Sequence, residues 1–290
     1  MSVVRILVNP KAGRGRGQRA LESIRAFAAQ QPGDWQVWTT DARGHATELA
    51  QRAISEGAEL VAAAGGDGTV HEALAGVLGS SAALAVLPVG TGNDLARMLP
   101  FGNDLPAALA ALAAGSASPV DVGIANGRPF LNVAGCGFDA RVAHRINHGL
   151  RFLKGTPAYL AAILAELATY RAASLRIETD SGTIETRAML CAVANSRSYG
   201  GGLQIAPSAV LDDGSLDLAV IHEIGKLDFV RTLPKAFSGR HTSHPKYHTR
   251  RVLRASIVSD SPLPVLVDGE LAGTTPLHVE IRPAAIRLVR

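Results

Sequence analysis

Three short segments combine glycines with aspartate, asparagine or lysine, the residue types that form phosphate-binding loops. The clearest is GGDGT at residues 65–69, directly after the apolar run Leu60–Ala64. Its glycines let the backbone approach a phosphate with no Cβ in the way, and free N–H groups at a helix N-terminus favour an anion. Asp67 repels phosphate, so this chemistry requires Mg²⁺ or a donor hydroxyl beside it. The alternative is a tight strand-to-helix turn with a capping aspartate.

Two further loops of this kind follow other apolar runs. NPKAG, Asn9 to Gly13, comes after Val3–Val8, and PVGTGND, Pro88 to Asp94, comes after Leu84–Leu87. The carboxyl ends of parallel strands lie at one edge of a sheet, where ligands bind. Three such loops at one edge favour a nucleotide site over three unrelated turns. The sequence contains neither the Walker pattern GxxxxGK[ST] nor a GxGxxG dinucleotide fingerprint in the required context.

Carboxylates in the second half of the chain lie in two further motifs. VDGE at residues 267–270 follows an apolar run, and its Asp268 and Glu270 fit either a hairpin turn or a catalytic carboxylate. Asp213, in LDDGSLDL at residues 211–218, fits a β-turn. A tight loop that offers oxygen ligands also suits Mg²⁺, so a turn and a metal site are compatible there.

The elements that would position the first three loops alternate between strand and helix. Strands are expected at Val3–Val8, Trp35–Thr40, Leu60–Ala64 and Leu84–Leu87, with apolar residues at helical spacing between them. Repeated strand–helix alternation is typical of a parallel sheet with helices on both faces. We therefore predict a three-layer α/β nucleotide-binding domain over residues 1–120.

From Pro119 onward the pattern becomes strand, turn, strand. Asn126-Gly127 between apolar runs is a strong hairpin signal, and a second hairpin is expected at residues 180–182. Helical patterns occur at about 157–170 and 226–238. Further strands are expected at Leu216–Ile221, Val252–Val258, Pro264–Val267 and Leu277–Ile281. These features predict a β-rich domain over residues 121–290, with the site in the cleft between the two domains.

Composition limits the class of protein and its partners. With 290 residues, 47% hydrophobic and 19% charged, the chain can bury a core and is not globally disordered. A net charge of +4 permits an anionic partner without choosing among nucleotide, nucleic acid and lipid surface. Cys136 and Cys191 lie in apolar sequence, which indicates buried thiols in a reducing cytoplasm. No signal peptide is visible, and Tyr159–Tyr170 is too short to span a bilayer.

The ordered set NPKAG, GGDGT and PVGTGND resembles the diacylglycerol kinase catalytic family, in its bacterial YegS-like branch. The similarity continues through VDVG (120–123), NVAGCGFDA (132–140), GGGLQIAPSAVLDDGSLDL (200–218) and VDGE (267–270), so it covers nearly the whole chain. Phosphofructokinases and NAD kinases also carry GGDG, but the ordered set is specific. The resemblance implies an NAD kinase- or phosphofructokinase-like first domain and a β-sandwich second domain.

The same resemblance implies ATP- and Mg²⁺-dependent phosphorylation of a lipid hydroxyl, above all that of diacylglycerol to give phosphatidic acid. Asp67, Asp94 and Asp121 would belong to a water-linked Mg²⁺ network, with Asp67 also a catalytic candidate. The residues that would line the ATP site are Asn9, Pro10, Lys11, Ala12, Gly13, Thr40, Gly65, Gly66, Asp67, Gly68, Thr69, Val70, His71, Gly90, Thr91 and Asn93.

Roles in the second domain follow from the resemblance in the same way. Asp268 would be the general base toward the lipid hydroxyl, with Glu270 beside it. Asp213 would hold a structural Mg²⁺ together with the backbone carbonyls of Val210 and Ser215. A carboxylate near a metal can accept the hydroxyl proton as the new bond forms.

Several alternatives stay open at this point. An NAD kinase would share the GGDG loop, and a non-catalytic regulator on the same fold would have lost the aspartates that this chain keeps. Phosphatidylglycerol, ceramide and sphingoid bases also offer a primary hydroxyl on an apolar body. The basic stretches Arg240–Arg254 and Arg141 to Lys154 indicate peripheral contact with anionic lipid at the inner face of the membrane rather than nucleic acid. The oligomeric state is not predicted.

Overall fold

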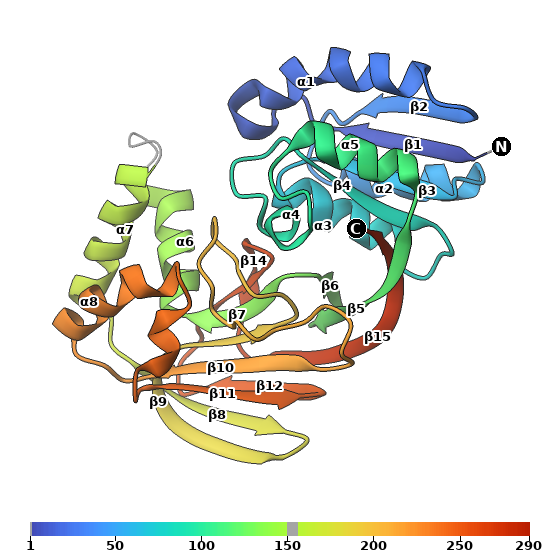
Figure 1. Cartoon of the computed structure of the whole chain (residues 1–290). Helices are drawn as coiled ribbons and strands as arrows, with labels where there is room; N and C mark the ends of the chain where they lie inside the picture. The colour runs from blue at the N-terminus through green and yellow to red at the C-terminus, as the bar shows by residue number, and fades with distance from the viewer. Residues whose placement is uncertain (1, 150–155) are drawn as a thin grey trace.

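The computed structural model describes residues 2–149 and 156–290. Its N-terminal half is a parallel sheet with strand order β2-β1-β3-β4 (Figure 1). These strands are β1 (Val3–Val8), β2 (Asp34–Thr39), β3 (Leu60–Gly65) and β4 (Ala83–Pro88). The accompanying helices are α1 (Ala12–Ala29), α2 (His45–Ser55), α3 (Asp67–Val77), α4 (Asp94–Met98) and α5 (Leu105–Ala114).

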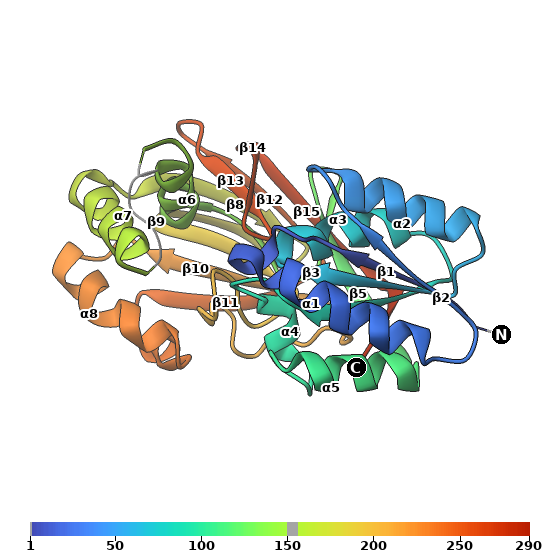
Figure 2. The same cartoon turned by 90° about the horizontal axis from the view of Figure 1, so that it is seen from above.

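Alternation along β1 decides which helices cover which face of this sheet. Ile6 packs in one apolar cluster with Ile24 of α1 and Leu112 of α5. The next residue, Leu7, packs in the opposite cluster with residues of α2 and α3. Successive side chains of a strand point to opposite faces, so an unbroken apolar run predicts burial on both sides. The two views show helices on both sides of the strands (Figures 1 and 2), and the three-layer α/β prediction is confirmed.

The C-terminal half is built mainly from antiparallel strands. They are β5 (Ala117–Ala125), β6 (Arg128–Phe130), β7 (Val133–Gly137), β8 (Ala173–Thr179), β9 (Gly182–Ala194), β10 (Leu216–His222), β11 (Tyr247–Val252), β12 (Arg254–Ser259), β13 (Pro264–Val267), β14 (Glu270–Thr274) and β15 (Leu277–Val289). Its helices are α6 (Phe138–Gly149), α7 (Thr156–Thr169), α8 (Lys226–Ala236) and the short 3₁₀ helix η1 (Arg240–Ser243). The predicted β-rich second half is confirmed, and so are both predicted hairpins, β5–β6 and β8–β9.

The last strand connects the two halves. β15 pairs antiparallel with β12 and β5, and then Arg287 and Leu288 pair in parallel with β4 of the first sheet. The final residues of the chain therefore extend the N-terminal sheet. A division of the chain at residue 120 stays a prediction.

One predicted strand is broken in two. The run Val252–Val258 divides at Leu253, because β11 pairs with β10 whereas β12 pairs with β8 and β15. Asp180 in the β8–β9 turn stabilises the break by accepting hydrogen bonds from the N–H groups of Leu253 (2.8 Å) and Arg254 (3.3 Å). A continuous apolar pattern does not reveal a change of partner strand. Among the residues described, no helix combines the length and apolar composition needed to cross a bilayer.

Candidate active site

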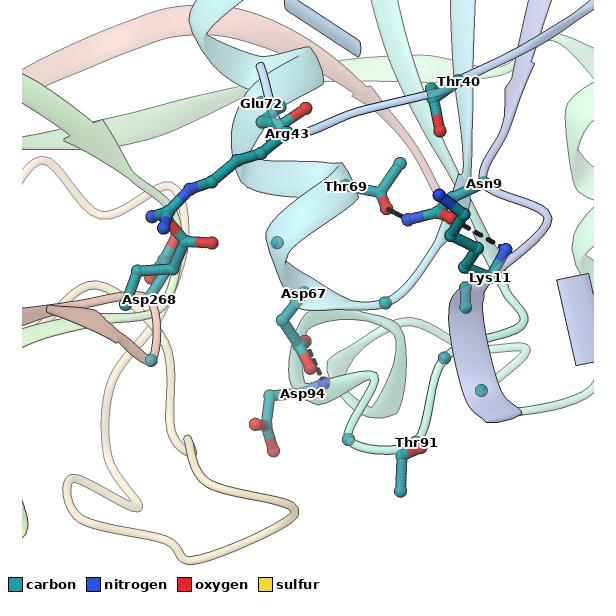
Figure 3. Close-up of a pocket in the computed structure, with 18 of the residues that line it drawn as sticks. Asn9, Lys11, Thr40, Arg43, Asp67, Thr69, Glu72, Thr91, Asp94 and Asp268 are labelled. Carbon is teal, nitrogen blue, oxygen red and sulfur yellow. Dashed lines mark hydrogen bonds and ion pairs between the residues drawn. The ribbon is translucent and has the colours of Figure 1, made fainter. Parts of the chain in front are cut away.

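A cleft with a cavity volume of about 780 Å³ lies between the two halves of the molecule. On the N-terminal side it is lined by the loops that follow β1, β2, β3 and β4, all at the carboxyl edge of the parallel sheet. On the other side it is lined by Asn132, residues 199–201 and residues 268–270. Figure 3 shows labelled side chains from both sides around one open space. The predicted loops are thus brought together at one edge.

The glycine-rich loops approach one another through their backbones. A Cβ added at Gly90 would lie 2.2 Å from the Cα atom of Gly66, so the loops at residues 65–69 and 88–94 meet at a distance that only glycine permits. A Cβ at Gly13 would lie 2.1 Å from the carbonyl oxygen of Val89, and Gly13 also has a φ of 57°. Part of the glycine content therefore serves loop-to-loop packing.

Asn9 connects the loop at residues 9–13 to the start of α3 through hydrogen bonds. Its side-chain oxygen accepts from the N–H of Lys11 (3.0 Å), and its amide nitrogen donates to the hydroxyl of Thr69 (3.1 Å). The ammonium group of Lys11 donates to the carbonyl of Asp41 at 3.2 Å. These bonds fix the loop and direct Lys11 along the rim of the cleft.

Asp67 begins α3 and holds the loop that follows β4. Its two carboxylate oxygens accept hydrogen bonds from the N–H groups of Asn93 (2.9 Å) and Asp94 (2.6 Å). Asn93 has a φ of 53°, which turns both N–H groups toward the carboxylate. Burial, reinforced by the negative charge of Asp94, raises the pKa of Asp67 to about 6. A nearby cation would stabilise the ionised form.

Asp94 joins the two halves across the cleft. Its carboxylate accepts hydrogen bonds from the N–H groups of Gly201 (2.9 and 3.0 Å) and Gly202 (2.8 Å). Burial raises the pKa of Asp94, and these backbone bonds only partly oppose that rise. Asp94 therefore positions the glycine loop 200–202 over the cleft.

On the C-terminal side of the cleft, the carboxylate of Asp268 is fixed by hydrogen bonds from the backbone. Asp268 occupies the two-residue turn between β13 and β14, where its φ is 47°. One carboxylate oxygen accepts from the N–H groups of Asn132 (2.9 Å) and Val133 (3.0 Å), and the other from that of Leu131 (3.0 Å). Three backbone N–H groups therefore fix this carboxylate in the lining of the cleft.

His71 and Arg43 bring positive charge to the same carboxylates. His71 Nδ1 lies 3.7 Å from Asp268 Oδ2. Burial lowers the pKa of His71, but the carboxylates of Asp268 and Glu270 outweigh it, so the net shift raises the pKa. Arg43, from the loop after β2, forms an ion pair with Glu270 across the cleft, and its side chain is 74% exposed.

Acidic groups dominate the lining of the cleft. The two basic groups in the lining are Lys11 and Arg43. The six acidic groups are Asp41, Asp67, Glu72, Asp94, Asp268 and Glu270. Within residues 2–149 and 156–290, no group of three or more His, Cys, Asp or Glu side chains is arranged to hold a metal ion by itself.

The comparisons with known proteins point to one family. The family model of the diacylglycerol kinase catalytic domain matches residues 3–125, and that of the YegS C-terminal NAD kinase beta sandwich-like domain matches residues 132–290. The chain is 31% identical over 276 residues to a diacylglycerol kinase of Staphylococcus aureus (strain MRSA252), covering 94% of this chain and 88% of the relative. The chain belongs to the diacylglycerol kinase family. It is a lipid kinase, and a kinase of this family uses ATP.

Two more relatives support the assignment to the diacylglycerol kinase family. A diacylglycerol kinase of Staphylococcus saprophyticus subsp. saprophyticus is 29% identical over 274 residues, which cover 94% of this chain and 90% of that protein. The crystal structure of a diacylglycerol kinase from Bacillus anthracis str. Sterne superposes with a TM-score of 0.75 at 25% identity, covering 99% of this chain and 96% of that one.

Most residues predicted for the site of this lipid kinase line the cleft. They are Asn9, Lys11, Ala12, Gly13, Thr40, Gly66, Asp67, Gly68, Thr69, Gly90, Thr91, Asp94, Asp268 and Glu270. A smaller group is not among the lining residues, although its members directly adjoin them or pack close by: Pro10, Gly65, Val70, His71 and Asn93. The individual roles in binding and catalysis stay predictions.

The structure separates Asp121 and Asp213 from this cleft. The oxygens of Asp121 accept from the N–H groups of Gly214 (2.7 Å) and Ala284 (2.8 Å), so it holds two backbone segments together. Asp213 accepts from the N–H (3.1 Å) and hydroxyl (2.8 Å) of Ser215 and pairs with Arg251 at 2.9 Å. Binding of Mg²⁺ by Asp213 with the backbone carbonyls of Val210 and Ser215 stays a prediction, and the cation would compete there with Arg251 for the carboxylate.

Arg43, Glu72, Asn132, Tyr199 and residues 200–201 line the cleft but were not predicted. Glu72 accepts from the N–H groups of Gly44 (2.8 Å) and Ala46 (3.1 Å) and so positions the loop that carries Arg43. That loop follows a predicted parallel strand, and the rule that placed the other three loops could have found it. No local pattern marks Tyr199, because only tertiary packing brings it to the cleft.

Proposed function

We propose that this lipid kinase transfers the γ-phosphoryl group of ATP to the hydroxyl group of a diacylglycerol, forming phosphatidic acid. The observation that supports this best is a single cleft that has glycine-rich loops on one wall and, on the other, the carboxylate of Asp268, which is fixed by backbone hydrogen bonds. Phosphoryl transfer depends mainly on positioning and on electrostatic stabilisation of the phosphates, and these two walls supply both.

The N-terminal wall suits the triphosphate of ATP. The residues after β3 begin α3, so backbone N–H groups near Gly66 and Gly68 are available to an anion. Lys11 and Arg43 supply the two positive charges of the lining. Gly68 leaves open space, since a Cβ there would meet only Glu270 Oε1 at 3.2 Å. We assign phosphate binding to the loops 9–13, 65–69 and 90–93.

The charge balance of the cleft supports a requirement for Mg²⁺. Six acidic groups against two basic ones would repel a nucleotide that arrived without a cation. Mg²⁺ keeps several waters and uses one or two protein carboxylates together with substrate phosphates. Asp67 and Asp94 fit this requirement, because both are buried at the phosphate wall with raised pKa values. Bound Mg²⁺ would supply charge neutralisation on the phosphates.

Asp268 is the proposed general base. Its three backbone hydrogen bonds fix the carboxylate in the lining of the cleft, where the lipid hydroxyl would donate to it. As the hydroxyl oxygen attacks phosphorus, its proton passes to Asp268, and Glu270 stays paired with Arg43 at the rim. His71, 3.7 Å from Asp268, stabilises the charged carboxylate before transfer.

A turnover assay with several acceptors tests the proposal. The protein, labelled ATP and Mg²⁺ are incubated with diacylglycerol, phosphatidylglycerol, ceramide, sphingosine or NAD, and products are identified by mass. Label in phosphatidic acid, lost when Mg²⁺ is chelated, is the expected result. Label in another lipid with none in phosphatidic acid would contradict the substrate, and label only in the NAD product would contradict the whole assignment.

We also propose that the kinase works at the inner face of the membrane by peripheral contact with anionic lipid. The basic stretch Arg240–Arg254 supports this, although Arg251 is partly neutralised by Asp213. The second stretch includes residues 150–155, which lie outside the described residues, and its Arg141 and Arg145 are paired with Glu166. Binding to anionic vesicles should exceed binding to neutral ones and should weaken as salt rises.

A further inference from the structure

Helix α8 has apolar side chains on its outer side as well as on its inner side. On the inner side, Phe229 and Leu233 pack in one apolar cluster with residues of α6 and α7. On the outer side, Leu227 is 64% exposed, Val230 is 39% exposed, and Phe237, the residue just after the helix, is 51% exposed. A surface helix of a globular protein normally has one apolar stripe, directed at the core. Packing within the described chain therefore explains only the inner side.

The outer apolar residues form one stripe. They follow one another at intervals of three, four and three positions, so Leu227, Val230, Pro234 and Phe237 share one face of the helix. Three of them belong to the seven large apolar side chains that are exposed in the described part of the chain. Single exposed apolar residues are common on protein surfaces, whereas a gathered stripe indicates a contact surface. Both views place α8 at the outer edge of the C-terminal half, away from the N-terminal sheet (Figures 1 and 2).

Basic side chains flank this stripe. Lys226, Arg231 and Lys235 belong to α8 and are exposed. The acidic residue of the helix, Asp228, is paired with His244 at 3.2 Å. The outer side of α8 is therefore positively charged as well as apolar. This combination is typical of a helix that lies in the interface of a membrane containing anionic lipid, with its apolar side chains below the head groups.

A second copy of this chain is a less suitable partner for the stripe. The commonest symmetric dimer brings the same surface of both copies together. The three basic side chains of one α8 would then face those of the other, and like charges repel. An anionic bilayer has the opposite charge, and its hydrocarbon accepts the apolar side chains.

We infer that the outer side of α8, formed by Leu227, Val230, Pro234 and Phe237 with their basic neighbours, inserts into the surface of a bilayer that contains anionic phospholipid. The inference rests on the proposed function in that the kinase meets its acceptor at a membrane. It adds an apolar contact to the electrostatic contact of Arg240–Arg254, which begins three residues after Phe237. Salt screens the electrostatic part, whereas the burial of apolar side chains is not screened.

Sedimentation with vesicles of phosphatidylcholine and phosphatidylglycerol, in the absence of ATP, tests the inference. Leu227→Ser should weaken partitioning about tenfold and Val230→Ser about threefold, because each loses apolar surface that the bilayer buries. Val258→Ser, the same change at a valine of β12 that is 45% exposed, is the matched control and should leave partitioning unchanged. High salt should weaken the binding of all these proteins while the differences between them persist.

A fluorescent label gives a second readout. Both native cysteines, Cys136 and Cys191, are buried, so a cysteine introduced on the surface can be labelled selectively with an environment-sensitive nitrobenzoxadiazole dye. In Val230→Cys, vesicles should make the dye brighter and shift its emission to shorter wavelength, and spin-labelled phosphatidylcholine should quench it. In Val258→Cys, the dye should not respond. Thermal melting should be unchanged in every variant, because the substituted side chains are exposed.

The outcomes separate this inference from the proposed function. Equal partitioning of wild type and Leu227→Ser, or a dye in Val230→Cys that does not respond to vesicles, would overturn the insertion of α8. A changed oligomeric state of Leu227→Ser in ultracentrifugation, with unaltered vesicle binding, would assign the stripe to a second copy instead. Phosphorylation of the water-soluble dibutyrylglycerol should be equal in all variants. Absence of phosphatidic acid from the wild-type reaction would overturn the proposed substrate, and vesicle binding would still decide the role of α8.

Discussion

The two walls of the cleft are built in different ways. On the N-terminal wall, the partners are near in sequence: Asp67 binds the backbone of Asp94, 27 residues away. On the C-terminal wall, Asp268 binds the backbone of Asn132, 136 residues away. The first wall is assembled from consecutive strand–loop–helix units, and the second from segments that lie far apart in the chain. The phosphate wall therefore depends on local backbone conformation, and the acceptor wall depends on long-range packing.

The largest expected effect comes from the acceptor wall. Asp268→Asn removes the basic oxygen and should lower turnover about 10²- to 10⁴-fold. It also leaves the N–H of Leu131 facing an amide group, so the free energy of unfolding should fall by about 1–3 kcal/mol. Steady-state kinetics, ATP calorimetry and chemical denaturation measure these quantities. Glu270→Gln is the control, and near-normal turnover in Asp268→Asn would make Glu270 the next candidate base.

Two glycines of the phosphate wall should respond differently. Gly90→Ala drives a Cβ against the backbone of Gly66 and should cost about 3 kcal/mol in unfolding free energy. A Cβ at residue 68 meets only the flexible side chain of Glu270, so the Gly68→Val protein should fold but lose ATP binding. Thermal melting and calorimetry distinguish them. Unchanged ATP affinity in folded Gly68→Val would contradict the phosphate role of that loop.

The pH dependence of stability tests the buried pair Asp67 and Asp94. Because the pKa of Asp67 is raised from 3.8 to about 6, the folded state holds a proton that the unfolded state releases. As the pH rises from about 4 to about 6, the contribution of Asp67 to the free energy of unfolding therefore falls by about 2 kcal/mol. Asp67→Asn should remove this pH dependence, measured by denaturation at pH 4.5 and 7. Parallel curves for both proteins would argue against the raised pKa.

The smallest expected effect concerns the contact between the walls. Arg43→Ala removes one of two cationic groups from the lining and should weaken ATP binding about tenfold, the loss of one charge-assisted contact. Stability should change little, because the Arg43 side chain of this pair is 74% exposed. Arg52→Ala, which removes an arginine of similar exposure paired with Glu56, is the matched control. Equal ATP affinity in both variants would exclude Arg43 from phosphate binding.

Much of the phosphate wall follows from the sequence. Apolar strands that each end in a glycine-rich loop predict the parallel sheet, its layers and the edge where the loops meet, because parallel strands have a common polarity. Helix α5 was missed: its residues are almost uniformly apolar, so no helical period marks it. Its start is visible only in the cap, where Asp104 accepts from the N–H of Ala107 at 3.1 Å.

The sequence by itself determined the two halves, the three loops and the aspartates available for chemistry, since these depend on local patterns and residue types. Tertiary structure decided which of those aspartates share the cleft: it brought Asp67, Asp94 and Asp268 together and directed Asp121 and Asp213 to backbone and Arg251 partners. It also brought Tyr199 to the lining of the cleft. The physical reason is that a carboxylate's role depends on the groups around it, and in the C-terminal half those groups come from segments far apart in the chain.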